Sequence, residues 1–232
     1  IALHGLRLSE TTLGSKVVVI GLGVIGQLVC RLAEAQGSEV TGIDPDPERS
    51  KYGDNFFTSV DDVELKDVDT VIITAATSSN EPIELATKIA RNKAKIVVIG
   101  DIPLNISRND FYYKELELVV SKSYGPGRYD KQYEALGNDY PIEYVRWTEN
   151  RNFEAFTKLL SQKQIHLLDL VSEEIAFEDA PSVYEKFEDE IKPLSVVLRY
   201  NIDAEPKIEI ENDLQPEPKT SKVNVGILGA GN

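Results

Sequence analysis

The chain has 232 residues, of which 41% are hydrophobic, and a chain of this size can form a full core. Its net charge of −14 would repel phosphate backbones and anionic lipids, so we expect no nucleic-acid partner and no membrane partner. The single cysteine, Cys30, excludes a disulfide framework, and no apolar stretch approaches the roughly 20 residues that span a bilayer. We expect a cytoplasmic globular protein.

The first predicted elements are a strand, a glycine turn, a helix and a second strand. An apolar run over residues 16–20 leads into the G-x-G-x-x-G motif, which is followed by a helical pattern. A second apolar run over residues 39–43 ends at Asp44. This order of elements is the fingerprint of a dinucleotide-binding domain. The predicted phosphate-binding residues are Gly21, Leu22, Gly23, Val24, Ile25 and Gly26.

Each glycine of the motif has a physical role. Gly21 allows a sharp turn after the strand, Gly23 allows a pyrophosphate to approach the backbone, and Gly26 allows the helix to pack closely on the sheet. The helix that begins near Val24 would direct its free N–H groups at the phosphates. The alternative interpretation is that these glycines only tighten a turn between strand and helix.

Asp44 predicts the choice of cofactor. A carboxylate at the end of the second strand can accept hydrogen bonds from both ribose hydroxyls of an adenosine, and its charge would repel a 2′-phosphate. We therefore predict NAD rather than NADP, although Arg49 nearby leaves room for NADP. The alternative interpretation is that Asp44 only caps a helix.

Further along the chain, apolar runs alternate with an amphipathic helix. This alternation predicts an α/β fold of the Rossmann type, a doubly wound parallel sheet with flanking helices over residues 15–145. The predicted elements are strands at 68–74, 95–100 and 116–120 and a helix at 82–91. Ala75, Ala76 and Thr77 follow a central strand and are small enough to line the cofactor, and Gly100 holds a similar position.

The C-terminal part has a different pattern. Residues 146–201 predict a short α+β return segment, with helices at 149–162 and 178–187 and strands at 168–171, 174–177 and 195–200. Residues 202–222 are rich in proline and acid and predict a linker. Residues 223–232 predict a strand and a second glycine turn, the truncated start of a second Rossmann domain. Because the chain starts at Ile1 and has no methionine, we expect a piece of a longer protein.

Several segments resemble the medium-chain, zinc-type alcohol dehydrogenase family. They are 1–5 (IALHG), 13–23 (LGSKVVVIGLG), 68–75 (VDTVIITA) and 95–100 (KIVVIG). The resemblance implies that residues 1–14 are the remnant of a helix from an upstream GroES-like domain and that Arg49 contacts the adenosine ribose. It also implies that the zinc ligands lie in the upstream domain, so we expect no zinc in this chain.

A second resemblance is more specific. Residues 121–130 (SKSYGPGRYD) and the tail 224–232 (NVGILGAGN) are similar to a bi-domain subgroup in which this module is fused to a Gfo/Idh/MocA-type dehydrogenase. That resemblance implies a sugar-derived substrate and places Tyr124 and Gly125 near the nicotinamide. The alternative interpretation of these two residues is a simple turn.

Together these features predict the NAD(H)-binding domain of an oxidoreductase that acts on a sugar or sugar-derived alcohol. We assign no catalytic residue, since His4 and His166 are isolated in the sequence, and we expect the chain alone to be inactive. The alternative is a non-catalytic NAD-sensing regulatory domain. The sequence leaves open a homo-oligomer.

Overall fold

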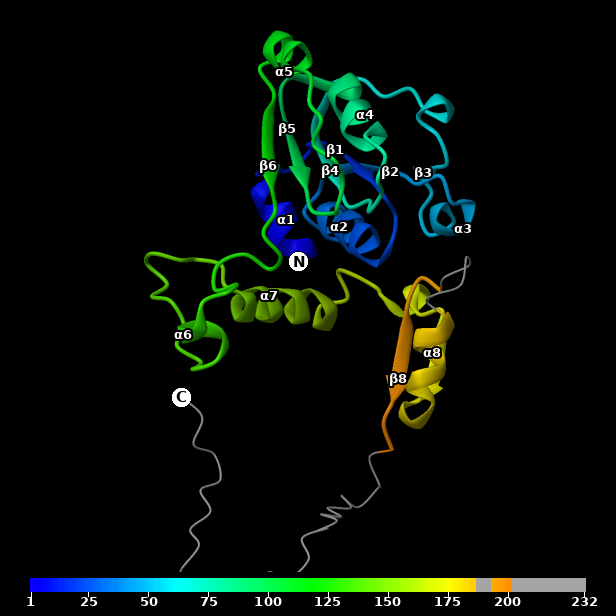
Figure 1. Ribbon diagram of the computed structural model, residues 1–232, viewed down its shortest axis with the longest axis vertical. Helices are drawn as coiled ribbons and strands as arrows, with labels where there is room; N and C mark the ends of the chain where they lie inside the picture. The colour runs from blue at the N-terminus through cyan, green and yellow to red at the C-terminus, as the bar shows by residue number, and fades with distance from the viewer. Residues whose placement is uncertain (187–192, 202–232) are drawn as a thin grey trace, which may run out of the picture. The chain divides into compact units, whose positions relative to one another are not determined.

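The computed structural model describes residues 1–186 and 193–201, and residues 1–199 form one compact unit (Figure 1). The strands of the main sheet are β1 (Lys16–Ile20), β2 (Glu39–Ile43), β3 (Phe56–Phe57), β4 (Val68–Ile73), β5 (Ala90–Val98) and β6 (Glu117–Val120). The helices before and between them are α1 (Ala2–Leu8), α2 (Val24–Ala35), α3 (Pro47–Ser50), α4 (Glu81–Ile89) and α5 (Arg108–Lys114), with a 3₁₀ turn at Val60–Asp62. After the sheet come α6 (Lys131–Glu134), α7 (Glu149–Ser161), a 3₁₀ turn at Leu168–Leu170, β7 (Glu173–Ala176), a 3₁₀ turn at Phe177–Asp179, α8 (Ala180–Lys186) and β8 (Val196–Arg199).

The main sheet has the strand order β3-β2-β1-β4-β5-β6, and every neighbouring pair is parallel. This is the strand order of the doubly wound dinucleotide-binding fold. The order reverses between β1 and β4, so a crevice opens beyond the carboxyl ends of these two strands. The predicted Rossmann-type parallel sheet with flanking helices is confirmed.

Alternate residues of the strands supply two separate cores. Val17 and Val19 of β1 face the layer that contains α1 and α2, whereas Val18 and Ile20 face the layer that contains α4. Both faces are buried because helices cover both sides of the sheet, which explains why β1 is a nearly continuous apolar run. Rigid packing on both faces fixes the strand ends that carry the candidate site.

The junction between α4 and β5 differs from the prediction. Arg91 was expected to end the helix, but α4 ends at Ile89 and β5 begins at Ala90, which pairs with Val68. The Lys114 ammonium group donates hydrogen bonds to the carbonyl oxygens of Thr87, Lys88 and Ala90 at 2.7–2.9 Å and so satisfies the helix end. A lysine 24 residues or more away in sequence ends the helix, and local periodicity carries no sign of it.

The return segment agrees with the prediction in part. The helix expected over 149–162 is α7, and the strands expected at 174–177 and 195–200 are β7 and β8, a parallel pair. The strand expected at 168–171 is wrong, because Leu168–Leu170 forms a 3₁₀ turn in which Leu170 is buried and Leu168 is exposed. The predicted linker and second glycine turn lie outside the described residues.

Cys30 is fully buried in the core beneath α2. Burial in apolar surroundings raises the pKa of its thiol, so at neutral pH little thiolate is available for reaction. We therefore expect iodoacetamide to leave the native chain unmodified and to alkylate Cys30 in denaturant, as mass spectrometry would show. Rapid alkylation of the native chain would contradict this packing of α2.

Candidate cofactor-binding site

The turn between β1 and α2 requires glycine at two positions. Gly21 has a φ of +96°, and a Cβ there would lie 2.5 Å from the backbone nitrogen of Ala75. A Cβ on Gly26 would lie 1.9 Å from the carbonyl oxygen of Gly21. The turn is therefore held against the end of β4, and α2 begins as close to the sheet as a backbone allows.

The third glycine leaves open space over the start of α2. Gly23 is the N-cap residue, it provides no side-chain cap, and the first turn of α2 holds no acidic residue. The first N–H groups of a helix have no intrahelical acceptor, so they remain available to an anion. A Cβ on Gly23 would meet one atom within 4 Å, Nη1 of Arg49 at 3.4 Å. This cradle fits a diphosphate.

Asp44 follows β2 and is fixed at the mouth of the same turn. Its side chain accepts a hydrogen bond from the backbone N–H of Leu22 at 2.6 Å and another from that of Asp46 at 2.9 Å. The residue is 6% exposed. A carboxylate with one bond to each oxygen keeps further lone pairs for a ligand, because each oxygen can accept more than one hydrogen bond.

The short helix α3 places Arg49 over the glycine turn. Asp46 caps this helix by accepting from the N–H of Glu48 at 2.9 Å, and Pro47 occupies its first turn. Arg49 pairs with Asp46 at 3.3 Å. The guanidinium group therefore lies over the backbone of Gly23, with Nη1 3.4 Å from the position of a Cβ on that glycine.

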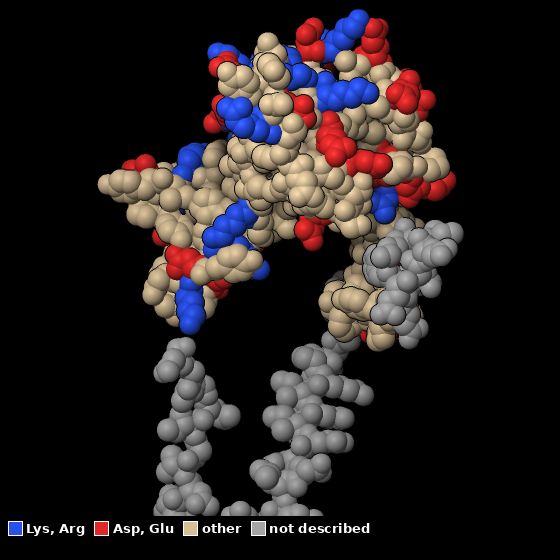
Figure 2. Space-filling view, turned by 45° about the horizontal axis from the view of Figure 1, so that its top comes forward, with Lys and Arg blue, Asp and Glu red and all other residues tan. Residues whose placement is uncertain are grey.

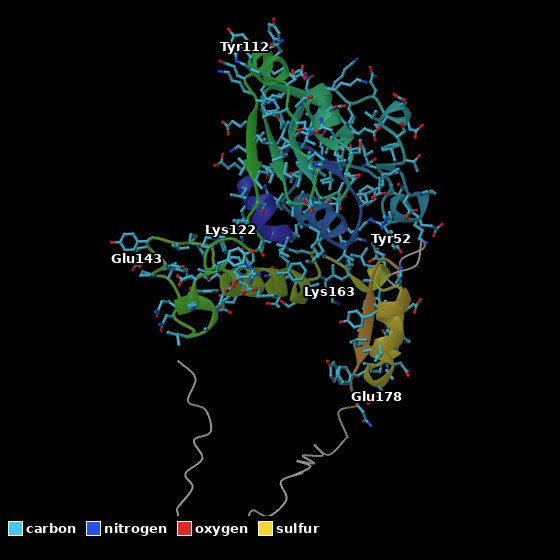
Figure 3. All side chains as sticks on the ribbon, viewed as in Figure 1. Tyr52, Tyr112, Lys122, Glu143, Lys163 and Glu178 are labelled. Carbon is cyan, nitrogen blue, oxygen red and sulfur yellow. The ribbon has the colours of Figure 1, made fainter. Side chains whose placement is uncertain are left out.

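These groups border a cleft of about 980 Å³ at the carboxyl ends of the central strands. A cleft of this size can hold a cofactor. In Figure 3, Tyr52 lies just beyond α3 on this side of the sheet, and Lys122 marks the segment that follows β6. Of the predicted site residues, the cleft is lined by Gly21, Gly23, Asp44, Arg49, Ala75, Ala76 and Thr77.

Two groups of residues that line this cleft were not predicted from the sequence. Thr58, Ser59 and Val60 after β3 line it from one side, and the first turns of α4 line it from the other. The α3–β3 segment carries no motif, so its approach to the cleft follows from the pairing of β3 with β2. One residue does connect the glycine turn to α3. Gln27 is a polar residue in an apolar stretch of α2, and its amide donates to the carbonyl oxygen of Arg49.

Acidic groups outnumber basic ones around the cleft. Asp44, Asp46, Glu81 and Glu84 line it together with Arg49 and Lys88. Acidic side chains also gather along the right-hand side of the sheet domain in the space-filling view (Figure 2). Such a lining opposes an additional phosphate group on a ligand.

Gly100 lies beside the cleft rather than in its lining. A Cβ there would lie 1.9 Å from the carbonyl oxygen of Ala75. The loop after β5 is tied to the loop after β4 because the N–H of Thr77 donates to the carbonyl oxygen of Asp101 at 3.0 Å. Glycine is therefore needed here for close contact between two strand ends.

Tyr124 lines a second, mostly apolar pocket of about 330 Å³ between α1, α2 and α7, together with Ile25. Two other predicted residues belong to the glycine turn but do not line the large cleft. Leu22 is buried and its backbone N–H donates to Asp44, and Val24 is half-buried. A hydrogen bond to Glu134 raises the pKa of the Tyr124 phenol. The structure thus separates Tyr124 from the residues that line the large cleft.

Gly125 packs against His4 of α1. A Cβ on Gly125, where φ is +94°, would lie 2.5 Å from the imidazole ring. Burial lowers the pKa of His4, and the positive charge of Arg7 acts in the same direction. The lowered pKa favours the neutral ring, which packs against Gly125, and the sequence analysis did not predict this contact.

Within residues 1–186 and 193–201, no group of three His, Cys, Asp or Glu side chains is arranged to hold a metal ion. His4 and His166 lie in separate places, His4 against Gly125 and His166 in the lining of a third pocket near α2 and β3. The same stretches contain no helix long and apolar enough to cross a membrane.

One protein-family model matches the part of the chain that contains the glycine turn. Residues 4–110 match the sequence model of the NAD binding domain of D-isomer specific 2-hydroxyacid dehydrogenases. The match runs from α1 into α5 and includes the glycine turn and Asp44. This part of the chain is therefore an NAD-binding Rossmann domain, and the predicted cofactor, NAD, is supported. The matched family differs from the one that the sequence resembles, and the match covers less than half of the chain, so it shows the kind of domain and not the family of the whole chain.

Two curated relatives match more of the chain. One is 2-dehydro-3-deoxy-L-galactonate 5-dehydrogenase of Pseudoalteromonas atlantica, 28% identical over 62% of this chain and 44% of the relative. The other is D-guloside 3-dehydrogenase of Escherichia coli, 22% identical over 85% of this chain and 57% of the relative. The chain thus spans about half the length of these relatives.

Among solved structures, galactitol-1-phosphate dehydrogenase from Escherichia coli has a TM-score of 0.66 and is 21% identical. The similarity covers 85% of this chain and 57% of that one. At this identity the likeness concerns the fold, and it extends past the sheet into the return segment.

Proposed function

We propose that this chain holds NAD(H) as part of an oxidoreductase that acts on a sugar or sugar-derived alcohol. The observation that carries the proposal is the arrangement of three groups at one cleft, namely the open backbone at Gly23, the fixed carboxylate of Asp44 and the guanidinium of Arg49. The two relatives that match most of the chain are dehydrogenases of sugar derivatives, which supports the substrate class.

In this proposal the chain binds and orients the cofactor. Bound NAD supplies the hydride chemistry, and the protein supplies position and electrostatics. The backbone from Gly21 to Gly26 and the guanidinium group of Arg49 hold the phosphates, and Asp44 holds the adenosine ribose. Ala75, Ala76, Thr77 and Gly100 border the path toward the nicotinamide, whereas Tyr124 and Gly125 lie outside this cleft.

The charge around the cleft supports NAD over NADP. A 2′-phosphate on the adenosine ribose would lie beside Asp44 and among a lining in which carboxylates outnumber cations. Arg49 could offset part of this repulsion, as it already pairs with Asp46. We therefore propose a preference for NAD that depends on Asp44.

The proposal extends to the whole protein. We propose that the chain is a cytoplasmic fragment with domains at 15–145 and 146–201, taken from a zinc-type alcohol dehydrogenase-like protein fused to a Gfo/Idh/MocA-type dehydrogenase. The resemblances of residues 121–130 and 224–232 support this context. Catalysis would then need groups from outside the chain, so we expect no turnover from the chain alone.

The direct test is a titration of the chain with NADH and with NADPH, in which nicotinamide fluorescence reports binding. We expect saturable binding of NADH and at least tenfold weaker binding of NADPH, as one lost ribose contact and one added repulsion imply. Equal affinity for both cofactors would contradict the role of Asp44, and no binding of either would contradict the proposal.

A second measurement separates an enzyme from a regulatory NAD sensor. We expect the complete gene product to oxidise a sugar-derived alcohol in the presence of NAD, with absorbance at 340 nm as the readout. Binding of NADH without turnover across sugar acids, sugar phosphates and glycosides would favour the regulatory domain.

Gly23 provides a test within the glycine turn. We expect Gly23→Val to weaken NADH binding by about tenfold or more, because the new side chain occupies the space left for the diphosphate. The fold should be retained, since a Cβ there meets only the movable end of Arg49. Calorimetry and thermal denaturation measure the two effects. Undiminished affinity would place the phosphates elsewhere.

A further inference from the structure

Gln27 is a fully buried glutamine on the first turns of α2. Its amide nitrogen donates hydrogen bonds to the carbonyl oxygen of Leu22 at 3.3 Å and to that of Arg49 at 3.0 Å. Leu22 belongs to the glycine turn and Arg49 belongs to α3, which are separate segments of the chain. One side chain therefore ties together the two parts of the candidate site.

The orientation of this amide is fixed by chemistry. Nη1 of Arg31 donates to the side-chain oxygen of Gln27 at 2.9 Å, and a guanidinium group can only donate. The two carbonyl oxygens on the other side can only accept, so the nitrogen of the amide must face them. A flipped amide would oppose donor to donor and acceptor to acceptor.

Arg31 is itself held from a distant segment. Its Nε donates to the carbonyl oxygen of His166 at 3.0 Å, and its Nη2 forms an ion pair with Asp169. A chain of polar contacts therefore runs from the return segment through Arg31 and Gln27 to the backbone of Arg49. A buried network in which each partner is satisfied favours one geometry over others.

We infer that Gln27 is a positioning residue for NAD(H), which holds α3 so that the Arg49 guanidinium lies over the glycine turn. The inference rests on the proposed binding of NAD(H) at this turn. Arg49 is well placed to act on the diphosphate because its Nη1 lies 3.4 Å from the position of a Cβ on Gly23. The hydrogen bond from Gln27 fixes the backbone that carries this guanidinium.

The inference predicts which ligands depend on Gln27. A ligand with a diphosphate, such as ADP-ribose, uses both the glycine turn and Arg49, whereas adenosine has no phosphate to place there. Gln27→Met retains the length of the side chain and removes both the donor and the acceptor. We expect this variant to weaken ADP-ribose binding about tenfold and to change adenosine binding less than about twofold.

A double-mutant cycle with Arg49→Met tests whether the effect passes through Arg49. We expect each single variant to weaken ADP-ribose binding and the double variant to be no weaker than Arg49→Met alone, because the two changes remove one interaction. A general loosening of the fold would add its effect to that of Arg49→Met and would weaken both ligands alike. Either of those results would overturn the inference.

Gln36→Met is the matched control. Gln36 caps the C-terminal end of the same helix, and its amide donates to the carbonyl oxygen of Thr11, away from the cleft. We expect wild-type affinity for both ligands from this variant. If Gln27→Met does not fold, Arg31→Met takes its place, since it leaves the Gln27 amide free to turn, and we expect the same selective loss of ADP-ribose.

All affinities are measured by calorimetry or by displacement of NADH, with thermal denaturation of each variant. A wild-type chain that binds neither NADH nor ADP-ribose overturns the proposed function and this inference together. A wild type that binds both, with Gln27 variants that lose neither or lose ADP-ribose and adenosine equally, overturns the inference and leaves the proposed function in place.

Discussion

Gly26→Ala is expected to abolish NADH binding and to lower the free energy of unfolding by about 3 kcal/mol. The added Cβ would lie 1.9 Å from the carbonyl oxygen of Gly21 and 2.8 Å from Oγ1 of Thr74. The first of these atoms is backbone and is held by a hydrogen bond from the Thr74 hydroxyl at 2.5 Å. The turn must therefore move as a whole, and the N–H groups that face the diphosphate move with it.

Urea denaturation and NADH titration of the same preparation measure both effects. Gly23→Ala is the matched control, because its Cβ meets only Nη1 of Arg49 at 3.4 Å. We expect that control to keep the wild-type stability. Wild-type stability of Gly26→Ala would mean that α2 begins further from the sheet than described above.

Asp44→Ala is expected to weaken NADH binding about 100-fold, since two hydrogen bonds from ribose hydroxyls to a charged group contribute about 1.5 kcal/mol each. NADPH binding should change far less, because the variant also removes the charge that repels a 2′-phosphate. The preference for NADH would then be reduced or lost. Fluorescence titrations of both cofactors against wild type and variant give the four dissociation constants.

The loss of Asp44 also removes hydrogen bonds to the backbone of Leu22 and Asp46, so a control must separate stability from binding. Asp69 is suitable, because its carboxylate accepts from the N–H of Lys16 at 2.8 Å and from Arg91 at 2.7 Å, away from the cleft. We expect Asp69→Ala to lower stability without changing affinity. An Asp44→Ala variant with an unchanged NADH to NADPH ratio would remove the role given to this carboxylate.

The sequence predicted the parts of the fold that depend on local pattern. The unit from β1 to Asp44 combines two apolar runs, glycine spacing and a terminal acid, so its two strands were predicted with their observed bounds and its helix with its observed start. The strand at β4 was recognisable because it lies inside the sheet and is mostly buried, and β6, at the edge of the sheet, was recognisable as a short apolar run.

The parts that escaped prediction depend on distant contacts. Lys114 satisfies the end of α4, the turn at Leu168–Leu170 buries Leu170 and pairs Asp169 with Arg31, and Gly125 packs against His4. The role of Gln27 has the same origin, since its partners are carbonyl groups that any residue could provide. Every residue has a backbone carbonyl, so the sequence does not indicate which carbonyl accepts a hydrogen bond from a side chain. Only the folded chain shows this.

The central claim is that the start of α2 holds a diphosphate while Asp44 holds the adenosine ribose. A crystal structure of the chain with NAD tests it most directly. We expect phosphate oxygens within hydrogen-bonding distance of the N–H groups after Gly23, and both ribose hydroxyls on the Asp44 carboxylate. NAD bound elsewhere, or bound in this cleft with the ribose turned away from Asp44, would contradict the claim.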